Sequence, residues 1–488
     1  MNKNTLVAKI WSFCDTLRDD GVSYGDYLEQ ITYLLFLKMA DEYSSQTPKK
    51  SFNIPKNCEW SSLLRTNIDQ LISKYSNDLK KLGKAGGMLS KIFDGAQNKI
   101  HDQYKLRKLI ELINDENWIT ESVDIKGDIY ESLLQKNAES SGAGQYFTPR
   151  PVIQAMVECI NPQPLQTISD PSCGTGGFFL GALSYLRTNN NLNSKEDEFL
   201  KFNTFHGWEI VPSTARLCLM NLFLHGIGDL QTTPEIEVTD SLKDSLERTV
   251  DIVLANPPFG KTSSDIATND EKKAKQEGFH LRKDFWVTTS NKQLAFLQHI
   301  VTMLKPEGGK AAVVLPDNVL FEGGAGESIR KKLLEDVNLH TILRLPTGIF
   351  YAQGVKANVL FFETKKRTKS PSTNEIWYYD YRTNVHHTPK HNPLQFDSLM
   401  NFVSCFKASN RSRCKETWSE KNKEGRWRKY CYEEIVKRDK ANLDIFWLKD
   451  NSVIDLANLP SPDTLITEIV ENIESALENF KTIRDTLG

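Results

Sequence analysis

Between residues 150 and 363, short apolar runs alternate with amphipathic stretches, and this alternation constrains the fold more than any other feature of the chain. Residues 167–186, 202–227 and 293–316 each combine a strand-like run with a stretch whose apolar residues recur every three or four positions. Strands that alternate with helices build a mostly parallel sheet with helices on both faces. We therefore predict an α/β, doubly wound sheet.

The sequence divides into four parts. Residues 1–140 have helical periodicity and no clear strand, and residues 141–370 contain the alternation of strands and helices. Residues 371–460 form a polar region rich in Lys, Arg and Trp. Residues 461–488 repeat apolar residues as a coiled-coil seam does and predict an amphipathic C-terminal helix. That helix can dock on a partner protein or pack on the helical N-terminal domain.

Composition limits the class of protein. The 488 residues carry a net charge of −2, so any nucleic acid must be bound through local basic patches or through a partner. No apolar run approaches the ~18 residues of a membrane span, and the charged N-terminus is not a signal peptide. The eight cysteines are scattered without a C-x-x-C pair. This pattern predicts reduced thiols, a cytoplasmic location and no zinc site.

A glycine-rich turn, "DPSCGTGGF" at 170–178, lies where the first strand of the α/β part meets its helix. Gly174, Gly176 and Gly177 allow the backbone to approach a ligand closely and expose helix N-terminal N–H groups. The order G-T-G-G differs from the G-x-G-x-x-G of dinucleotide-binding proteins. The turn predicts a ligand site, although a purely structural tight turn has the same composition.

Acidic residues end the next two strands. Glu209 in "GWEI" is placed to accept hydrogen bonds from ribose hydroxyls. Asp240, at the end of "EIEVTD", is either a second ligand or the N-cap of a following helix. Two carboxylates suit a ligand with hydroxyls, an amino group and no phosphate. S-adenosylmethionine fits that description better than a nucleotide.

The stretch "GAGQYFTPR" at 142–150 lies just before the first strand and its preceding helix. Tyr146 and Phe147 are candidates for the wall of the cofactor pocket. Thr148 and Pro149 are candidates for the cap of the next helix. Capping and a hydrophobic staple alone would also explain these residues.

The strand "DIVLA" stops at "NPPF", which is Asn256 to Phe259. One proline is enough to end a strand, because proline cannot donate to the ladder. The side-chain oxygen of Asn256 and the carbonyl of Pro257 are two acceptors for the hydrogens of an exocyclic amine, which raises its reactivity toward a methyl group. Pro257 and Pro258 hold that carbonyl rigid, and Phe259 offers a face on which a flipped base can stack. The tetrapeptide therefore predicts a catalytic site.

The motifs "GQYFTPR", "DPSCGTGGF", "GWEI" and "NPPF", in this order, resemble those of N6-adenine DNA methyltransferases. The resemblance is closest to the modification subunit of type I restriction–modification enzymes. It covers nearly the whole chain, including the helical N-terminal domain and "NLDIFWLKD" at 442–450. It implies that residues 141–370 form a Rossmann-like, S-adenosylmethionine-dependent methyltransferase domain. N-P-P-aromatic alone also occurs in enzymes that methylate glutamine side chains, so the specificity lies in the four motifs together.

The resemblance also implies a role for each motif residue. Residues that would line the cofactor site are Gln145, Tyr146, Phe147, Thr148, Pro149 and Arg150. The methionine moiety would be held by the first strand end and the glycine turn, at Asp170, Gly174, Thr175, Gly176 and Gly177, with Glu209 on the ribose and Asp240 as a further candidate. Asn256, Pro257 and Phe259 would grip a flipped adenine, and the methyl group would pass directly to its N6.

The resemblance implies partners as well. A separate specificity subunit would read double-stranded DNA, with two modification subunits for each specificity subunit, and a restriction subunit would cleave and translocate. Two other functions stay open: a methyltransferase acting on protein or RNA, and a silent scaffold that binds cofactor only to regulate assembly. The intact "NPPF" argues against the scaffold.

Other polar segments carry weaker signals. His386, His387 and His391 lack Cys, Asp or Glu partners nearby, so we predict no metal site. Residues 261–284 follow the catalytic motif and are expected to be a mobile segment that orders over DNA or cofactor. The best candidates for phosphate contacts are basic clusters with one tryptophan, namely Lys365, Lys366, Arg367, Lys369, Arg426, Trp427, Arg428 and Lys429.

Overall fold

The computed structural model describes residues 10–13, 17, 21–46, 54–116, 118, 130–134, 136, 147–229, 231–243, 249–259, 267–277, 279–350, 355–388 and 392–450. Gln145, Tyr146, His391 and the predicted helix at 461–488 lie outside these ranges. Within them, no helix is both long and apolar enough to cross a membrane.

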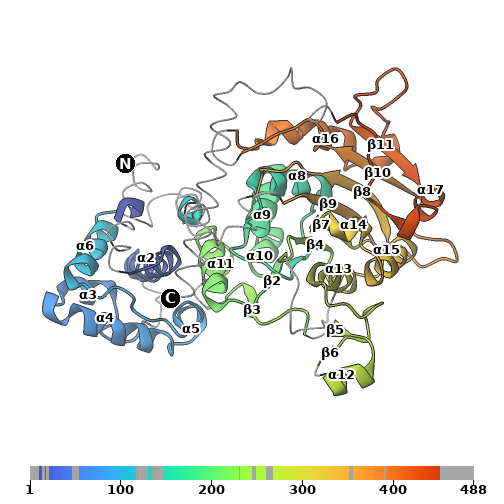
Figure 1. Cartoon of the computed structure of the whole chain (residues 1–488). Helices are drawn as coiled ribbons and strands as arrows, with labels where there is room; N and C mark the ends of the chain where they lie inside the picture. The colour runs from blue at the N-terminus through green and yellow to red at the C-terminus, as the bar shows by residue number, and fades with distance from the viewer. Residues whose placement is uncertain are drawn as a thin grey trace.

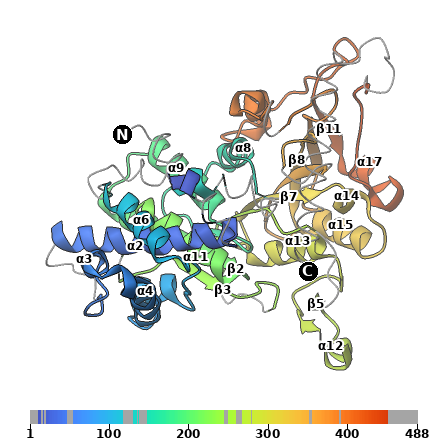
Figure 2. The same ribbon diagram turned by 60° about the vertical axis from the view of Figure 1, so that its left-hand side comes forward.

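The described residues of the N-terminal part form helices joined by turns and loops, with no strand among them (Figure 1). Its helices are α2 (Tyr24–Gln46), α3 (Trp60–Arg65), α4 (Ile68–Leu82), α5 (Gly87–Phe93) and α6 (Gln103–Asn114). The central helix α2 is apolar on all sides, as "YLLFLKMA" shows, so it is buried among the others rather than lying on the surface. Figure 2 shows α2 running through the middle of this domain toward α11 (Pro212–Leu224).

The described residues from 147 onward contain a nine-stranded sheet in the order β11-β10-β8-β9-β7-β4-β1-β2-β3. The strands are β1 (Ile168–Asp170), β2 (Phe205–Glu209), β3 (Glu235–Val238), β4 (Ile252–Ala255), β7 (Lys310–Pro316), β8 (Asn338–Arg344), β9 (Ala357–Glu363), β10 (Glu375–Asp380) and β11 (Trp427–Cys431). Only β9 and β11 run antiparallel to their neighbours, while all other pairs are parallel. The predicted α/β sheet is confirmed.

Helices cover both faces of the sheet. Alternate residues of the central strands point to opposite faces, so each strand contributes to two apolar cores. Ile252 and Leu254 of β4 belong to one apolar core, and Val253 and Ala255 belong to the other. The first core contains α8 (Arg150–Ile160), α9 (Gly177–Asn189), α11 and α16 (Met400–Phe406). The second contains α13 (Lys292–Met303), α14 (Asn318–Phe321), α15 (Ala325–Asp336) and α17 (Tyr432–Val436). Smaller elements are α10 (Ser194–Phe202), β5 (Ala267–Thr268), α12 (Glu271–Glu277) and β6 (His280–Leu281).

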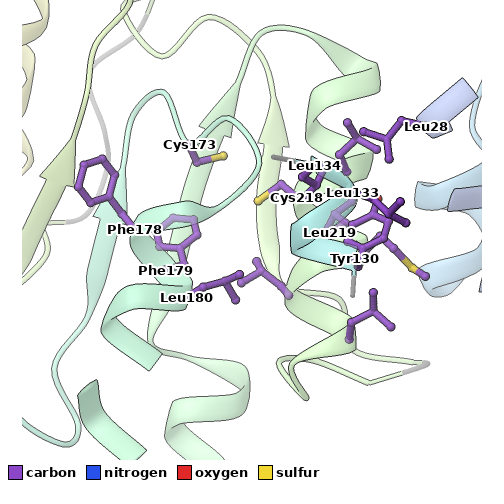
Figure 3. Close-up of a cluster of buried hydrophobic side chains, with 14 of the residues drawn as sticks. Leu28, Tyr130, Leu133, Leu134, Cys173, Phe178, Phe179, Leu180, Cys218 and Leu219 are labelled. Carbon is purple, nitrogen blue, oxygen red and sulfur yellow. The ribbon is translucent and has the colours of Figure 1, made fainter. Parts of the chain in front are cut away.

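The N-terminal helices share the first core with the sheet. Figure 3 shows Leu28 of α2, Leu133 of the segment 130–134 and Leu219 of α11 lying together in this core. The Arg216 guanidinium of α11 forms an ion pair with Glu29 of α2, and both side chains are largely buried. The hydroxyl of Tyr130 forms a hydrogen bond of 2.7 Å with the hydroxyl of Thr32 in α2. The N-terminal helices are therefore packed against the sheet domain through its helix α11.

Residues 371–460 contribute β10 and β11 to the main sheet. Sequence analysis treated this region only as polar. In β11 Trp427 is buried, Arg428 and Tyr430 are half-buried, and Lys429 and Cys431 are exposed, as suits a strand at the edge of the sheet. Its aromatic residues pack inward, and Trp427 stacks on Trp377 of β10 with ring centroids 5.1 Å apart.

Candidate active site

The order of the strands reverses beside β1. The chain runs outward through β1, β2 and β3, and then returns to place β4 on the other side of β1. In open α/β sheets, ligands bind at such a reversal, outside the carboxyl ends of the strands. Asp170 is the last residue of β1, and Asn256 directly follows β4. The fold therefore brings the glycine turn and "NPPF" to the same crevice.

A cavity of about 500 Å³ opens at this point. Its lining includes seven of the residues that sequence analysis assigned to the site: Phe147, Gly174, Thr175, Glu209, Asp240, Asn256 and Pro258. The glycine turn reaches it because Gly174 and Gly176 adopt positive φ angles of 54° and 83°. Gly176 is also the N-cap of α9, so the turn leads directly into a helix N-terminus.

Asp170 lies beneath the glycine turn with 2% of its surface exposed. The pKa of its carboxyl is raised to about 8, mainly by burial and to a lesser extent by the charge of Glu209, while hydrogen bonds from Ser172 oppose the rise. The backbone N–H of Ser172, which lines the cavity, donates to Oδ1 of Asp170 at 2.9 Å. The Asp170 carboxyl therefore lies close to the cavity and is mostly protonated near neutral pH. A cation bound beside it would favour its ionised form.

Glu209 faces the cavity from the end of β2. Its two carboxylate oxygens accept backbone N–H groups, Oε2 from Gly174 at 3.1 Å and Oε1 from Val211 at 2.9 Å. Partial burial raises the pKa of this carboxyl, while these two bonds oppose the rise. Each oxygen retains a second lone pair, so the held carboxylate can still accept hydroxyl groups.

Asp240 lies two residues beyond β3 and combines the two roles left open for it. Its Oδ1 accepts the N–H of Leu242 at 2.9 Å, and its side chain also lines the cavity. Residues 241–243 form a turn, and the rest of the predicted helix lies outside the described residues. Asp240 is thus a turn-capping residue at the mouth of the cavity.

The "NPPF" turn is held from two sides. Nδ2 of Asn256 donates to the hydroxyl of Thr148 at 2.9 Å. Nε2 of Gln293, a buried residue of α13, donates to the carbonyl of Pro258 at 3.1 Å. Pro257 is buried. These bonds tie the turn to the segment before α8 and to α13.

A second cavity, of about 290 Å³, lies on the other side of the turn. Its walls are Phe259, Asn291, Gln293, Pro316, Asn318, Val355 and Lys356. Asn291 lines both cavities, so they are adjacent. The carboxylate of Glu322 accepts the side-chain amides of Asn291 at 2.8 Å and Asn318 at 3.2 Å. The first cavity is thus lined by carboxylates at the ends of strands, and the second is lined by an aromatic ring and side-chain amides.

The remaining motif residues support the cavities rather than line them. Pro149 is the N-cap of α8, and Arg150 forms an ion pair with Glu131 of the N-terminal part. Gly177 begins α9, where an added Cβ would lie 3.2 Å from Ile153 of α8. Cys173 is buried, and its contact with the Cys218 thiol together with burial raises its pKa, so it stays a thiol.

The segment after "NPPF" has local structure of its own. Its described residues form β5, α12 and β6, which project below the sheet domain in Figure 1. Arg282 anchors the end of this excursion: it is buried, pairs with Asp284 at 2.8 Å and donates to the carbonyl of Leu242 at 3.0 Å. Leu242 lines the first cavity, so the excursion is joined directly to the cavity wall.

One predicted phosphate contact, Trp427, is wrong, and those at the basic residues stay predictions. Trp427 is 1% exposed, so it is a core residue. Lys365 follows Glu363, the end of β9, which pairs with the first residue of β7. The basic cluster that begins at Lys365 therefore lies at the end of the strands opposite the cavities. Arg426 donates to two backbone carbonyls, those of Asp380 and Thr383.

In "HHTPKH" the side chain of His387 forms hydrogen bonds within the protein. The ring nitrogens of His387 lie 2.9 Å from the Tyr381 hydroxyl and 3.0 Å from the Asn392 carbonyl oxygen. Among the described residues, no group of three or more His, Cys, Asp or Glu side chains could hold a metal ion.

Sequence analysis missed part of the cavity wall. Leu134 comes from the N-terminal part, and Ile210 and Val211 follow Glu209. Ile210 is 62% exposed, which is unusual for an aliphatic side chain and is a signal of a ligand-facing wall. The cavity wall also includes Thr289 to Lys292, at the start of α13. In the sequence, the one feature that marks this stretch is an asparagine at Asn291 that can cap the helix.

Comparison with known proteins identifies the family. A model described as N-6 DNA Methylase matches residues 121–446, and one described as HsdM N-terminal domain matches residues 6–113. The chain is 39% identical to the type I restriction enzyme StySPI methylase subunit of Salmonella potsdam, over all of this chain and 96% of that protein. The chain belongs to the N-6 DNA methylase family.

Within this family the chain is similar to whole methylase subunits. It is 38% identical to the type I restriction enzyme EcoKI methylase subunit of Escherichia coli K12, over all of this chain and 96% of that protein. A solved chain from work on complex assembly and conformational transition of the type I R-M system superposes with a TM-score of 0.73 at 27% identity, covering 100% of this chain and 99% of that one.

These matches confirm the family, the methyltransferase fold and the enzyme class expected from the sequence. As a member of this family, the chain uses S-adenosylmethionine and methylates N6 of adenine in DNA. Among the three functions left open, DNA adenine methylation is therefore the one that the chain has.

Proposed function

We propose that the "NPPF" turn is the catalytic centre of this methylase, and that the two cavities hold its two substrates. One observation carries this proposal: the turn lies between the cavities, with Asn256 and Pro258 lining the first and Phe259 lining the second. A group transferred from a ligand in one cavity to a ligand in the other must pass this turn.

The first cavity takes S-adenosylmethionine, whose sulfonium supplies an electrophilic methyl group. Glu209 accepts the ribose hydroxyls through the lone pairs left by its two backbone bonds. Asp170, with the glycine turn from Gly174 to Gly177, receives the cationic methionine end. Phe147, Leu134 and the exposed Ile210 form the apolar wall, and Asp240 lies at the mouth.

The second cavity takes the flipped adenine. Phe259 stacks on the base, and the side-chain oxygen of Asn256 and the Pro257 carbonyl accept the two N6 hydrogens. This polarisation makes the N6 lone pair available. N6 then forms its bond to the methyl carbon as the carbon–sulfur bond breaks, and N6 loses one proton to solvent.

The chain acts on double-stranded DNA within a larger assembly. Its relatives are named as methylase subunits of type I restriction enzymes, which supports a specificity subunit that reads the target and a restriction subunit that cleaves. Two modification subunits would join one specificity subunit in the cytoplasm. Residues 1–140 would form the helical domain. Residues 141–370 would form the catalytic domain together with the strands that 371–460 add to its sheet. Residues 461–488 would form the docking helix that contacts the specificity subunit.

The proposal is tested with Asn256→Ala in the complex of this chain with the specificity subunit encoded beside it. Single-turnover transfer of tritium from labelled S-adenosylmethionine to plasmid DNA is measured together with the Kd of the cofactor. We expect the variant to lose at least about 100-fold in transfer rate, since it removes an electrostatic contact to the reacting amine. Cofactor Kd should stay unchanged. A variant that keeps the wild-type rate would refute the catalytic role of the turn.

A further inference from the structure

The "NPPF" turn accounts for only part of the base that the second cavity would hold. In the proposed function, Asn256 and Pro257 accept the exocyclic amine, and Phe259 stacks on the ring. Cytosine also carries an exocyclic amine on a flat ring, so these contacts alone do not identify adenine. The ring nitrogens on either side of the adenine amine, N1 and N7, are both hydrogen-bond acceptors. Recognition of either nitrogen therefore needs a donor from the cavity wall.

An amide of the cavity wall, that of Asn318, is held in a fixed orientation by Glu322. Nδ2 of Asn318 donates to Oε2 of Glu322 at 3.2 Å, and Nδ2 of Asn291 donates to the same oxygen at 2.8 Å. A carboxylate accepts hydrogen bonds without donating any, so each amide must turn its nitrogen toward Glu322. The chemistry of the partner thus sets which end of each amide points where.

The two amides differ in the groups that they have left for a ligand. Oδ1 of Asn291 accepts the backbone N–H of Leu294 at 3.2 Å and so caps α13. Among the described residues, Oδ1 of Asn318 has no hydrogen-bond partner, and its Nδ2 keeps a second hydrogen beyond the one given to Glu322. Asn318 is half-buried and lines the second cavity. It therefore brings an uncommitted donor to the cavity wall.

Asn318 lies at the same end of the sheet as the catalytic turn. The strand β7 runs beside β4, with Val313 opposite Ala255. Asn256 directly follows β4, and Asn318 lies two residues beyond Pro316, the end of β7. A base that stacks on the Phe259 ring in this cavity is therefore enclosed by a wall to which Asn318 belongs.

Two further donors in this wall are less suited to a base edge. Nε2 of Gln293 donates to the carbonyl of Pro258 and holds the turn. The Lys356 side chain is exposed, and a donor that water reaches gains little from a new partner.

We propose that Asn318 is a base-recognition residue, which donates its remaining Nδ2 hydrogen to N1 or N7 of the flipped adenine. This inference rests on the proposed function, because it needs the base to lie in the second cavity. If the ring nitrogen is replaced by C–H, the Asn318 donor loses its partner inside a closed site. Such a site discriminates against the altered base.

The test uses a duplex that carries the recognised site with one unmethylated target adenine. That adenine is replaced in turn by 1-deazaadenine and 7-deazaadenine, which keep the amine and lack one ring nitrogen each. Single-turnover methyl transfer is measured in the complex with the specificity subunit, for wild type and for Asn318→Leu. We expect one of the two analogues to slow wild type about tenfold or more, because a donor is left unpaired. The same analogue should slow Asn318→Leu at least about fivefold less.

The comparison of the two proteins isolates the contact. The intrinsic reactivity of an analogue, and any contact that the specificity subunit makes to it, affect both proteins equally and cancel. An equal analogue penalty in wild type and Asn318→Leu would overturn the inference, whatever the rate with adenine. So would a wild type that transfers to both analogues as fast as to adenine.

A matched control removes the same kind of bond far from the cavities. Nδ2 of Asn338 donates to Oε1 of Glu363 at 2.9 Å, at the opposite end of the strands. Asn338→Leu should keep the full analogue penalty, and a reduced penalty there would count against a specific role of Asn318. Asn318→Ala, which should lose the penalty as well, replaces Asn318→Leu if the latter lowers the thermal midpoint.

Asn256→Ala separates this inference from the proposed function. If that variant transfers at the wild-type rate, the catalytic role of the turn fails, and the inference fails with it. If Asn256→Ala is slow while Asn318→Leu keeps the analogue penalty, only the role of Asn318 is refuted.

Discussion

Replacing Asp170 by Asn should make the cofactor-free protein more stable at alkaline pH and weaken its binding of S-adenosylmethionine. Asp170 is 2% exposed, and burial raises the pKa of its carboxyl from 3.8 to about 8. The neutral amide of Asn resembles the protonated carboxyl in shape, and its oxygen can still accept the N–H of Ser172. The variant therefore removes the cost of a buried charge and retains the local hydrogen bond.

The sign and size follow from linkage between protonation and folding. Because the pKa of Asp170 is higher in the folded state than in the unfolded chain, its protonation stabilises the fold. That stability is fully present below the unfolded pKa of 3.8 and is lost as pH rises through about 8. The loss is about 1.4 kcal/mol per pH unit within this window. Between pH 6 and 8 it amounts to about 2 kcal/mol, allowing for partial ionisation near pH 8.

The assay is urea unfolding of cofactor-free wild type and Asp170→Asn at several pH values between 6 and 8. The difference between the two curves cancels the titration of all other groups that the substitution leaves unchanged. We expect wild type to lose stability relative to the variant by about 2 kcal/mol over this range. Parallel pH dependence of the two proteins would refute the assignment. Calorimetry in buffers of different ionisation enthalpy should also show that wild type releases a proton when the cofactor binds near pH 7.

Two further substitutions, each paired with a control substitution, test the construction of the site. Leu134→Ala should weaken cofactor affinity about tenfold, equivalent to ~1.4 kcal/mol, because it shortens an apolar wall of the cavity. Leu133→Ala, which truncates a buried neighbour outside the lining, should lower stability and leave the calorimetric Kd unchanged; equal effects of both on Kd would contradict this. Gly207→Ala should cost about 1–3 kcal/mol in urea unfolding, because its Cβ would lie 2.9 Å from Cys173, Phe179 and Ile236 behind the glycine turn. Gly25→Ala, whose Cβ meets only Ser23 at 3.9 Å, should raise stability by roughly 0.5 kcal/mol, and a comparable loss at both glycines would refute the packing argument.

The central strands could be predicted from the sequence because they are buried on both faces. Runs such as "IVLA" in β4 and "AAVVL" in β7 are continuously apolar, and a proline lies at the end of β7 and two residues beyond β4. The strands β10 and β11 were missed for the opposite reason. Their aromatic residues are mixed with Glu, Arg and Lys, since β11 is an edge strand and β10 pairs with it. Such a pattern also occurs in polar loops.

The active site was predictable where a residue breaks the pattern of its own element. Asn256 stands out because an amide follows directly on an apolar strand, and Glu209 stands out because a carboxylate ends β2. Leu134 has no such signal, because a leucine that faces a ligand looks the same in sequence as one that faces the core. The bond between Thr148 and Asn256 was also hidden, since it joins two segments that only the folded sheet brings together.

Identification of the methylated product tests the central claim most directly. The chain, with and without its specificity subunit, is incubated with plasmid DNA and S-adenosylmethionine carrying a deuterated methyl group, and the DNA is digested to nucleosides for mass spectrometry. We predict that the label appears only in N6-methyladenine, requires the specificity subunit and disappears with Asn256→Ala. Label in cytosine or in protein, or N6-methyladenine formed without the specificity subunit, would contradict this account.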